Sequence, residues 1–595
     1  MRSVREPSPM PLFLTVCLAR NHWLSVSLLI SLVFPPLTSA QASPPASNSI
    51  RGVVLNSATR EPIARALVTS AGNAYAGLTD DQGRFSFTLP SDLSFGGSFH
   101  AGKPGFLEDE RSNVGVSIFP NSESNPELLF TLTPESLITG RVTLPRAGSF
   151  DRISVELYRR QVTDGRGRWI PAATERARTK GDFRFAGLSA GTYKIFTGEL
   201  LDHDPLTADS DPDGPQFGYP PAYFPTASDF SSSAPINLAT GQTFQAELTP
   251  NLRRYYNIKI AIPNARPGEG VNITVAPSNH YGPGFSLGFN GQDQAIEGML
   301  PSGTYTVEAV SYGNSPASGV LTFTVHDAPV LTPTLLLLPS QSIPVNLKEE
   351  FVTASNNSSS TGLSDISAQN SITVRNSGSH VLHRRFPTLN LSLLPAEDFS
   401  AHPAASLAPI DNGDSTLRVN GALPGVYWLQ IYQSRGYVAS ATSGGVDLLT
   451  NPLVLTPGGS TAPIDITLRD DAAEIEGTIE NSSNEKSAHR QPPAVYCIPL
   501  PDSNGTFTQA SVQNNMQTNN AQANSAQPNY DQSIHFQCPN LPPGSYRVLA
   551  FDSPQNQLEY RSLEAMRPYE SKGPTVRLTG GQKETVTVPI GPTLK

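Results

Sequence analysis

The chain has 595 residues, of which 15% are charged, and its formal net charge is −10. At roughly 150 residues for each domain, this length predicts about four domains, and all-β modules can be smaller. The acidic balance without a long basic block gives no support for nucleic-acid binding, and we interpret it as a contribution to solubility. The 54 prolines and 47 glycines suit many short strands that are joined by turns.

An apolar run near the N-terminus predicts a secretory signal. Arg2 and Arg5 lie near the start of the chain, the apolar run 23–34 follows, and two prolines and several small residues come after it. This order is typical of a signal peptide, here residues 1–40, with cleavage after Ala40 or Ala42. An uncleaved anchor is the alternative, but the run is short for a bilayer span, and we expect no membrane span in the mature chain. The prediction is an exported protein of the periplasm, the outer surface or the extracellular medium.

The rest of the chain is organised around a repeated turn. The repeated unit consists of a leucine, a short turn that contains Pro, Gly or Ser, and Gly-x-Tyr. Its four copies end at Tyr193, Tyr305, Tyr427 and Tyr546. The copies lie roughly 120 residues apart, a period that suits one sandwich domain and is too long for a solenoid repeat. After each turn, alternate residues point to one face of a strand. The unit resembles the tyrosine corner of Greek-key sandwiches, in which a buried hydroxyl bonds to upstream backbone. We interpret these tyrosines as core residues.

The first module, residues 43–134, shows a set of motifs in a characteristic order. They are a strand, a Pro-containing segment, a hairpin and a Gly-Lys-Pro-Gly-Phe segment, at 50–54, 61–68, 78–87 and 102–106. This set resembles the carboxypeptidase regulatory-like domain, a transthyretin-like seven-stranded sandwich grouped with carbohydrate-binding-like folds. The resemblance implies the accessory domain of a carboxypeptidase and none of its zinc ligands. Phe99 replaces the tyrosine of the turn unit, so the corner hydroxyl is absent.

Four further modules follow the first. We place modules 2 to 5 at 135–251, 252–338, 339–470 and 471–595. Modules 4 and 5 each contain a polar insertion, at 353–379 and 504–532, that is too polar to pack. A Leu-x-x-Gly motif, interpreted as part of a shared closing hairpin, recurs at 238–241, 455–458 and 578–581. The predicted fold is all-β, a tandem array of about five Ig-like or transthyretin-like Greek-key β-sandwich modules. The whole chain resembles bacterial secreted multi-module proteins with carboxypeptidase regulatory-like domains.

Two short patterns suggest cross-links or metal binding. After removal of the signal, the remaining cysteines are Cys497 and Cys538, for which we expect either a disulfide or two buried thiols. Asp209, Asp211 and Asp213 alternate before a glycine, as in the opening of a calcium loop. The glutamate that such a loop needs at its twelfth position is missing. A solvated acidic loop is therefore the main expectation, with Ca²⁺ as the alternative, and no other cofactor is predicted.

Aromatic residues give the candidate ligand-binding positions, because glycan sites usually need exposed aromatic rings. The candidates are Trp428 and Trp169, together with Tyr219 and Tyr223. If Tyr427 points inward, Trp428 points outward, onto solvent or onto a neighbouring module. Packing between modules is the interpretation that we prefer for these aromatic residues, and ligand binding is the alternative.

The sequence gives little support for catalysis. It contains no His-Glu-x-x-His and no phosphate-binding loop. We therefore predict a non-enzymatic binding or scaffolding protein of the cell envelope, with glycans or envelope proteins as partners. The first alternative is a carbohydrate-binding protein that uses exposed aromatics. The second is a hydrolase with catalytic groups between modules, which would require histidine and carboxylates in one pocket.

Overall fold

The computed structural model describes most of the chain after residue 47. The described residues are 48–89, 95–108, 112–118, 127–145, 152–201, 216–277, 282–312, 316–352, 371–375, 381–385, 389–399, 405–408, 417–480, 493–503, 508–514, 534–551, 555 and 558–591. Almost all of their regular structure is β-strand, so the predicted all-β class is confirmed. Within these ranges, no helix has the length and apolar character needed to cross a bilayer. The predicted signal peptide, 1–40, lies outside the described residues.

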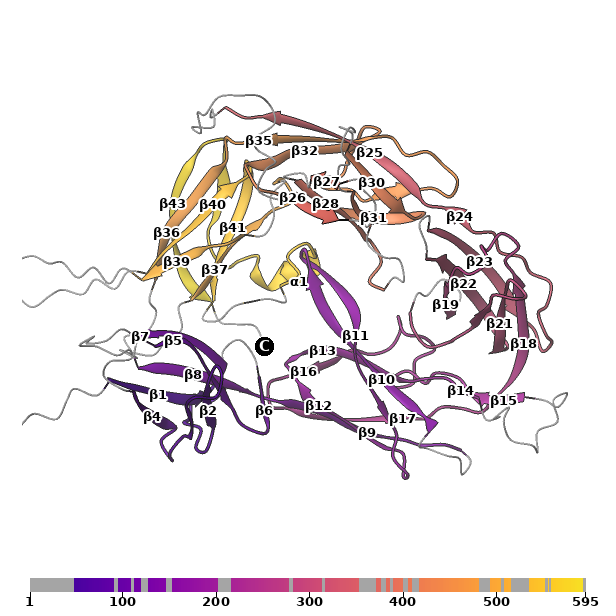
Figure 1. Ribbon diagram of the computed structural model, residues 1–595, viewed down its shortest axis with the longest axis horizontal. Coiled ribbons are helices and arrows are strands. Elements are labelled where there is room, and N and C mark those ends of the chain that lie inside the picture. Colours follow the sequence, from indigo (N-terminus) through magenta and orange to yellow (C-terminus); the bar gives the residue numbers. More distant parts are fainter. Residues whose placement is uncertain are drawn as a thin grey trace, which may run out of the picture.

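The larger hydrophobic cores follow one another along the described part of the chain. Five clusters of buried side chains run over 50–132, 138–248, 256–337, 343–468 and 473–588. Each cluster lies inside one predicted range, and we keep those ranges as the names of the modules. Figure 1 shows the modules following one another around a ring, with one long hairpin of module 2 directed towards its centre.

Module 1 consists of two four-stranded sheets, β4-β1-β8-β6 and β3-β2-β5-β7. Its strands are β1 (Asn48–Asn56), β2 (Leu67–Ser70), β3 (Ala76–Leu78), β4 (Arg84–Leu89), β5 (Phe95–Gly102), β6 (Phe106–Leu107), β7 (Asn113–Ile118) and β8 (Leu128–Pro134). Phe99 is fully buried and stacks on Phe87, with 5.5 Å between ring centroids. The phenylalanine therefore fills the core in the position where the other modules have tyrosine.

Module 2 also has two sheets, β11-β10-β13-β16 and β12-β9-β17. Its strands are β9 (Ser136–Val142), β10 (Ser154–Thr163), β11 (Arg166–Arg176), β12 (Asp182–Leu188), β13 (Gly191–Thr197), β14 (Leu200–Leu201), β15 (Gln216–Tyr219), β16 (Ile236–Leu238) and β17 (Thr243–Leu248). β14 and β15 leave module 2 and extend a sheet of module 3, in which β15 pairs with β18. The two modules thus share one sheet.

Module 3 is built from that shared sheet, β14-β15-β18-β21-β20, and from β19-β22-β23-β24. Its own strands are β18 (Arg253–Ala261), β19 (Val271–Pro277), β20 (Gly288–Asn290), β21 (Ala295–Pro301), β22 (Gly303–Ser311), β23 (Ala317–Val325) and β24 (Leu338–Pro339).

In module 4, nine strands form one continuous path, β33-β32-β35-β25-β30-β29-β28-β31-β34. The strands are β25 (Gln341–Glu350), β26 (Ser371–Arg375), β27 (Val381–Arg385), β28 (Leu389–Pro395), β29 (Ala405–Leu407), β30 (Leu417–Ala422), β31 (Gly425–Gln433), β32 (Tyr437–Ser443), β33 (Val446–Asp447), β34 (Leu453–Leu455) and β35 (Ile464–Arg469). β26 and β27 form a separate two-stranded sheet.

Module 5 follows the path β38-β37-β41-β43-β36-β40-β39, with β42 paired to β41. Its elements are β36 (Ala473–Glu480), β37 (Ala494–Pro499), β38 (Thr508–Gln509), β39 (Ser511–Asn514), β40 (Ile534–Leu541), β41 (Gly544–Phe551), the helix α1 (Leu563–Met566), the 3-10 helix η4 (Arg567–Tyr569), β42 (Thr575–Leu578) and β43 (Lys583–Gly591). A disulfide joins the buried Cys497 of β37 to Cys538 of β40. The structure thus has the disulfide and not two thiols.

One strand arrangement recurs in modules 1, 2, 4 and 5. The first strand of the module pairs in parallel with the last strand and antiparallel with the strand before the tyrosine turn, as β1 does with β8 and β4. The equivalent first strands are β9, β25 and β36. In β1, a Cβ on Gly52 would lie 2.5 Å from both the Leu128 carbonyl and the Phe85 ring. Glycine is required there because the phenylalanine of the neighbouring strand covers it.

The tyrosine turns form hydrogen bonds that explain their spacing. Each hydroxyl donates to the carbonyl oxygen four residues earlier, as Tyr427 does to Leu423 at 2.9 Å. Tyr193, Tyr305 and Tyr546 do the same to Ser189, Pro301 and Pro542. A Cβ on Gly425 would lie 3.2 Å from the Tyr427 ring, so the glycine lets the ring fold back over the turn. The predicted return of the hydroxyl to upstream backbone is confirmed.

The predicted closing hairpin is wrong. The strands on the two sides of the Leu-x-x-Gly motif do not pair with each other. β16 belongs to one sheet of module 2 and β17 to the other, and β34 pairs with β31 while β35 pairs with β25 and β32. The glycines have positive φ, 72° at Gly241 and 66° at Gly458. In module 2 the motif is an arch that carries the chain across the core, because the strand that ends at Leu238 and the strand that follows lie in different sheets.

Tyr427→Phe should lower the free energy of unfolding by about 1–2 kcal/mol, because it removes the donor to a buried carbonyl. Urea denaturation would measure the loss. Tyr312→Phe is the matched control, since Tyr312 is 50% exposed. Equal stability of the two variants would contradict a structural role for the Tyr427 hydroxyl.

Candidate binding site at the junction of three modules

The hairpin of β10 and β11 positions the site. Its tip is Asp164-Gly165, and the flanking Thr163 and Arg166 are paired. Both tip residues have positive φ, 49° and 71°, which is the backbone of a two-residue hairpin loop and favours Asp-Gly. β10 pairs with β13 only from Val155 to Arg159, so the outer part of the hairpin projects beyond its sheet. Figure 1 shows it reaching towards α1.

An ion pair joins the side of the hairpin to module 5. The Arg160 guanidinium donates to both carboxylate oxygens of Glu559, with 2.8 Å between Nη2 and Oε2. Both side chains are mostly buried. The hydrogen bond to Glu559 raises the pKa of Arg160 although burial opposes its charge. Two parallel bonds of this kind fix position as well as contribute energy.

The hairpin tip fits against residues 560 and 561. Asp164 accepts hydrogen bonds from the Tyr560 hydroxyl at 2.7 Å and from Arg561 Nη2 at 3.3 Å. The backbone N–H of Arg561 donates to the backbone carbonyl of Gly165 at 3.2 Å. A Cβ on Gly165 would lie 2.5 Å from the Tyr560 ring. Gly165 is therefore required both by the turn and by the close approach of module 5.

The other side of the hairpin meets module 4. The backbone N–H of Trp169 donates to the backbone carbonyl of Asp398 at 3.0 Å, and Arg160 lies 3.5 Å from the Asp398 carboxylate. The Arg166 guanidinium carbon lies 3.8 Å from the centre of the Trp428 ring. A cation over a tryptophan face at this distance is attracted to the ring electrons. One hairpin therefore holds parts of two other modules.

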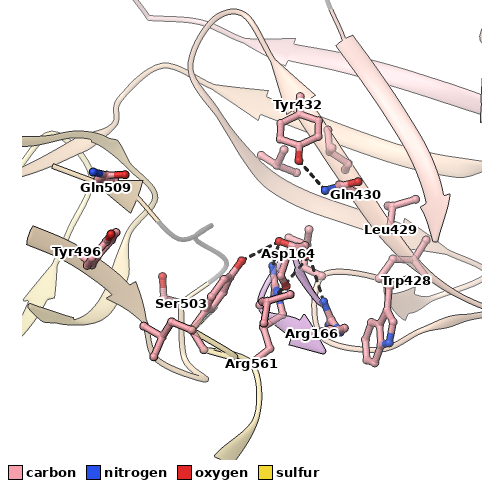
Figure 2. Close-up of a pocket in the computed structure, with 18 of the residues that line it drawn as sticks. Asp164, Arg166, Trp428, Leu429, Gln430, Tyr432, Tyr496, Ser503, Gln509 and Arg561 are labelled. Carbon is pink, nitrogen blue, oxygen red and sulfur yellow. Dashed lines mark hydrogen bonds and ion pairs between the residues drawn. The ribbon is translucent and has the colours of Figure 1, made fainter. Parts of the chain in front are cut away.

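A groove of about 390 Å³ lies where these three modules meet. We name it the junction groove and define it by seven of its lining residues: Asp164, Arg166, Trp428, Gln430, Tyr432, Tyr560 and Arg561. Figure 2 shows Arg166 and Trp428 to one side of Asp164 and Tyr496 and Gln509 to the other. The size falls in the range of small-molecule sites.

Strand β31 supplies the aromatic wall of the junction groove. Trp428, Gln430 and Tyr432 are alternate residues and share one face, while Tyr427 is buried on the other. Tyr432 is 60% exposed, and its hydroxyl accepts a hydrogen bond of 2.6 Å from Gln430 Nε2. The wall thus offers ring surface, a hydroxyl and an amide side by side.

The charge in the junction groove is unevenly balanced. Arg166 and Arg561 both contact Asp164, which is the one carboxylate among the lining residues that the structure describes. Burial and the neighbouring Arg561 lower the pKa of Arg166 to about 10. Both arginines stay charged at neutral pH. The described lining residues include no histidine, whereas the alternative of a hydrolase requires histidine and carboxylates in one pocket.

The structure brings Trp428 alone of the four aromatic candidates to the junction groove. Trp169 packs edge-on against Phe230, with 5.9 Å between centroids. Tyr219 and Tyr223 are buried, and the Tyr223 hydroxyl donates to the Pro283 carbonyl at 2.8 Å. The two buried tyrosine rings offer no face to a ligand, and the half-buried Trp169 ring packs against Phe230. Packing is the interpretation that the geometry favours for these three residues.

The calcium prediction concerns residues outside the described part of the chain. Asp209, Asp211 and Asp213 all fall in the gap between 201 and 216. Among the described residues, no group of three or more His, Cys, Asp or Glu side chains could hold a metal ion. Calcium binding therefore stays a prediction.

Sequence reasoning missed most of the junction. Asp164-Gly165 between two alternating runs is a strong hairpin signal, and it could have located the tip. Glu559, Tyr560 and Arg561 carry no comparable signal, because they act only through partners nearly 400 positions away. No local sequence pattern predicts a pairing between residues so far apart in the chain.

Comparisons with known proteins support no assignment. No protein-family model matches the chain, and no curated protein matches it. Among solved structures, the Bacillus anthracis TIE protein is similar at 11% identity, over 71% of this chain and 68% of that one, with a TM-score of 0.13. The Streptococcal ancillary pilin is 11% identical over 49% and 99% of the two chains, with a TM-score of 0.17. A minor pilin of Streptococcus agalactiae is 12% identical over 34% and 96%, also with a TM-score of 0.17. Likenesses at this level carry no argument about function.

Glu199 is a half-buried acid at the joint between modules 2 and 3. One carboxylate oxygen accepts 3.3 Å hydrogen bonds from the backbone and hydroxyl of Ser286, and the other oxygen is buried. Burial raises the pKa of Glu199 to about 7, although Tyr255 and Ser286 act in the opposite direction. The folded joint therefore binds a proton more tightly than the unfolded chain does.

The stability contributed by protonated Glu199 should be complete below pH about 4.5 and lost as the pH rises towards about 7. Glu199→Gln should remove this pH dependence and be more stable than the wild type at pH 8. Urea unfolding at several pH values tests it. Glu247→Gln, at an exposed position of the same module, is the control. A wild-type slope that survives in Glu199→Gln would exclude this carboxyl as its source.

Glu559→Gln should loosen the hairpin, because it removes the charge that pairs with Arg160. A hydrogen-bonded, mostly buried ion pair contributes about 1.5–3 kcal/mol, so amide hydrogen exchange at 160–169 should speed up by about tenfold or more. Asp182→Asn removes the carboxylate of the exposed Arg141–Asp182 pair and should change exchange little. Unchanged exchange in Glu559→Gln would show that this ion pair does not hold the hairpin in place.

Proposed function

We propose that the protein is an exported, non-catalytic scaffold of the cell envelope whose modules are locked together by the β10–β11 hairpin. The observation that carries this proposal is the bidentate pair of Arg160 with Glu559, which joins positions 399 residues apart. The contacts of Asp164 with Tyr560 and Arg561 support it.

A tandem array without such cross-links moves freely at each linker. The hairpin connects module 2 to modules 4 and 5, so three modules keep fixed relative positions. A rigid array presents its surfaces at fixed spacing, which strengthens binding to a partner with matching sites. This property suits a scaffold better than an enzyme.

Export is supported by the Cys497–Cys538 disulfide, since structural disulfides persist in oxidising compartments. The predicted signal peptide points in the same direction. Envelope proteins or glycans are the partners we expect, because both are accessible to an exported scaffold.

Small-angle scattering tests the locked arrangement. The wild type should give one compact distance distribution, and Arg160→Ala/Asp164→Ala should give a larger radius of gyration. Arg141→Ala/Asp182→Ala, which removes an exposed pair within module 2, should match the wild type. A wild type as extended as the junction variant would overturn the proposal.

Glycan binding is the second candidate function. The observation that favours it is the β31 wall, where Trp428 and Tyr432 flank the amide of Gln430. Aromatic faces stack on sugar rings, and amides bond to their hydroxyls.

A glycan-array screen of the mature protein tests the second candidate, with Tyr432→Ala and Trp428→Ala as site variants. Selective binding that both substitutions abolish would establish glycan recognition at this wall. Absence of binding would leave the scaffold with protein partners.

A further inference from the structure

The junction groove holds more positive than negative charge at one point. Arg166 lies 3.1 Å and Arg561 3.3 Å from Asp164 Oδ2. Both arginine side chains are about three-quarters buried, since 22% of the Arg166 side chain and 24% of the Arg561 side chain are exposed. Two partly desolvated cations that share one carboxylate attract a further anion, because attraction between charges strengthens as water is excluded.

The charge of the nearby Arg160 is balanced by carboxylates, unlike the charges of Arg166 and Arg561. Arg160 pairs with Glu559 and also lies near the Asp398 carboxylate. An anion that enters the junction groove is therefore drawn to the tip of the hairpin, at Arg166 and Arg561.

The contact with Trp428 leaves hydrogen-bonding capacity on Arg166. The indole ring takes one face of the guanidinium, whereas the five N–H donors lie in the guanidinium plane. Asp164 accepts from Nη1. Donors in that plane remain for a second acceptor, and a carboxylate is the geometry that a guanidinium binds best.

The surrounding groups indicate what the carboxylate is attached to. Tyr432 presents an exposed ring, and Gln430 and Gln509 bring amide groups to the walls. Rings stack on flat ligand faces, and amides both donate and accept hydrogen bonds. A ligand with a carboxylate, a ring and several hydroxyls matches each of these features.

We propose that the junction groove binds an acidic saccharide, with the uronate carboxylate held by Arg166 and Arg561 and the sugar ring against Tyr432. This inference rests on the second candidate function and names its ligand class. It is independent of the scaffold function, which depends on the hairpin and not on a ligand.

Titration calorimetry of the mature protein tests the inference with two matched probes, digalacturonic acid and the neutral digalactose of the same linkage. Digalacturonic acid should bind selectively, and its affinity should fall with added salt. Arg166→Gln should weaken binding by about tenfold or more, since it removes a charged hydrogen bond. Tyr432→Ala should also weaken binding, and Tyr312→Ala, at another exposed tyrosine, should leave it unchanged.

The possible results distinguish binding of an acidic saccharide from glycan binding in general. Equal binding of the neutral disaccharide would overturn the carboxylate assignment while keeping glycan recognition. Absence of binding to both sugars would overturn the inference and glycan recognition at this groove. Tighter binding of a polyglutamate peptide would replace the saccharide by an acidic peptide and also overturn it. Tyr432→Ala keeps the test valid if Arg166→Gln disturbs the hairpin, because Tyr432 makes none of the described contacts between the hairpin and module 5.

Discussion

The contact of Asp164 with Tyr560 and Arg561 is the constraint on which the arrangement of the modules depends. A two-residue turn holds the carboxylate at the end of a projecting hairpin, and the missing side chain of Gly165 leaves room for the Tyr560 ring. Neither module 2 nor module 5 could approach so closely with another residue at the tip. The junction groove exists because the hairpin, β31 and residues 558–561 meet there.

Inside the modules, one hydrogen-bonded tyrosine turn recurs. A tyrosine hydroxyl closes a turn by bonding to a carbonyl four residues earlier, and its ring fills the core. Module 1 keeps the ring as Phe99 without the hydroxyl. Packing of the ring is therefore the shared requirement, and the hydrogen bond is an addition that fixes the turn in the other modules.

Spacing in the sequence was enough to predict the all-β fold, the inward Tyr427 and the outward Trp428, because these follow from the two-residue period of a strand. The Leu-x-x-Gly motif was misinterpreted, since a turn between two alternating runs looks the same whether it joins neighbours in one sheet or crosses between sheets. The partners of Arg160 and Asp164 were out of reach for a different reason. Their pairing depends on how whole modules are placed, and no short pattern encodes that placement.

The wide separation of the two halves of the junction has a consequence for biosynthesis. Arg160 is translated 399 positions before Glu559, so most of three further modules must be synthesised before the two side chains can meet. In modules 1, 2, 4 and 5 the first strand likewise waits for the last strand to cover its edge. Each of these modules can therefore complete its sheet only after its own last strand has been made, and the contact between the hairpin and module 5 can form only after residue 559 has been made.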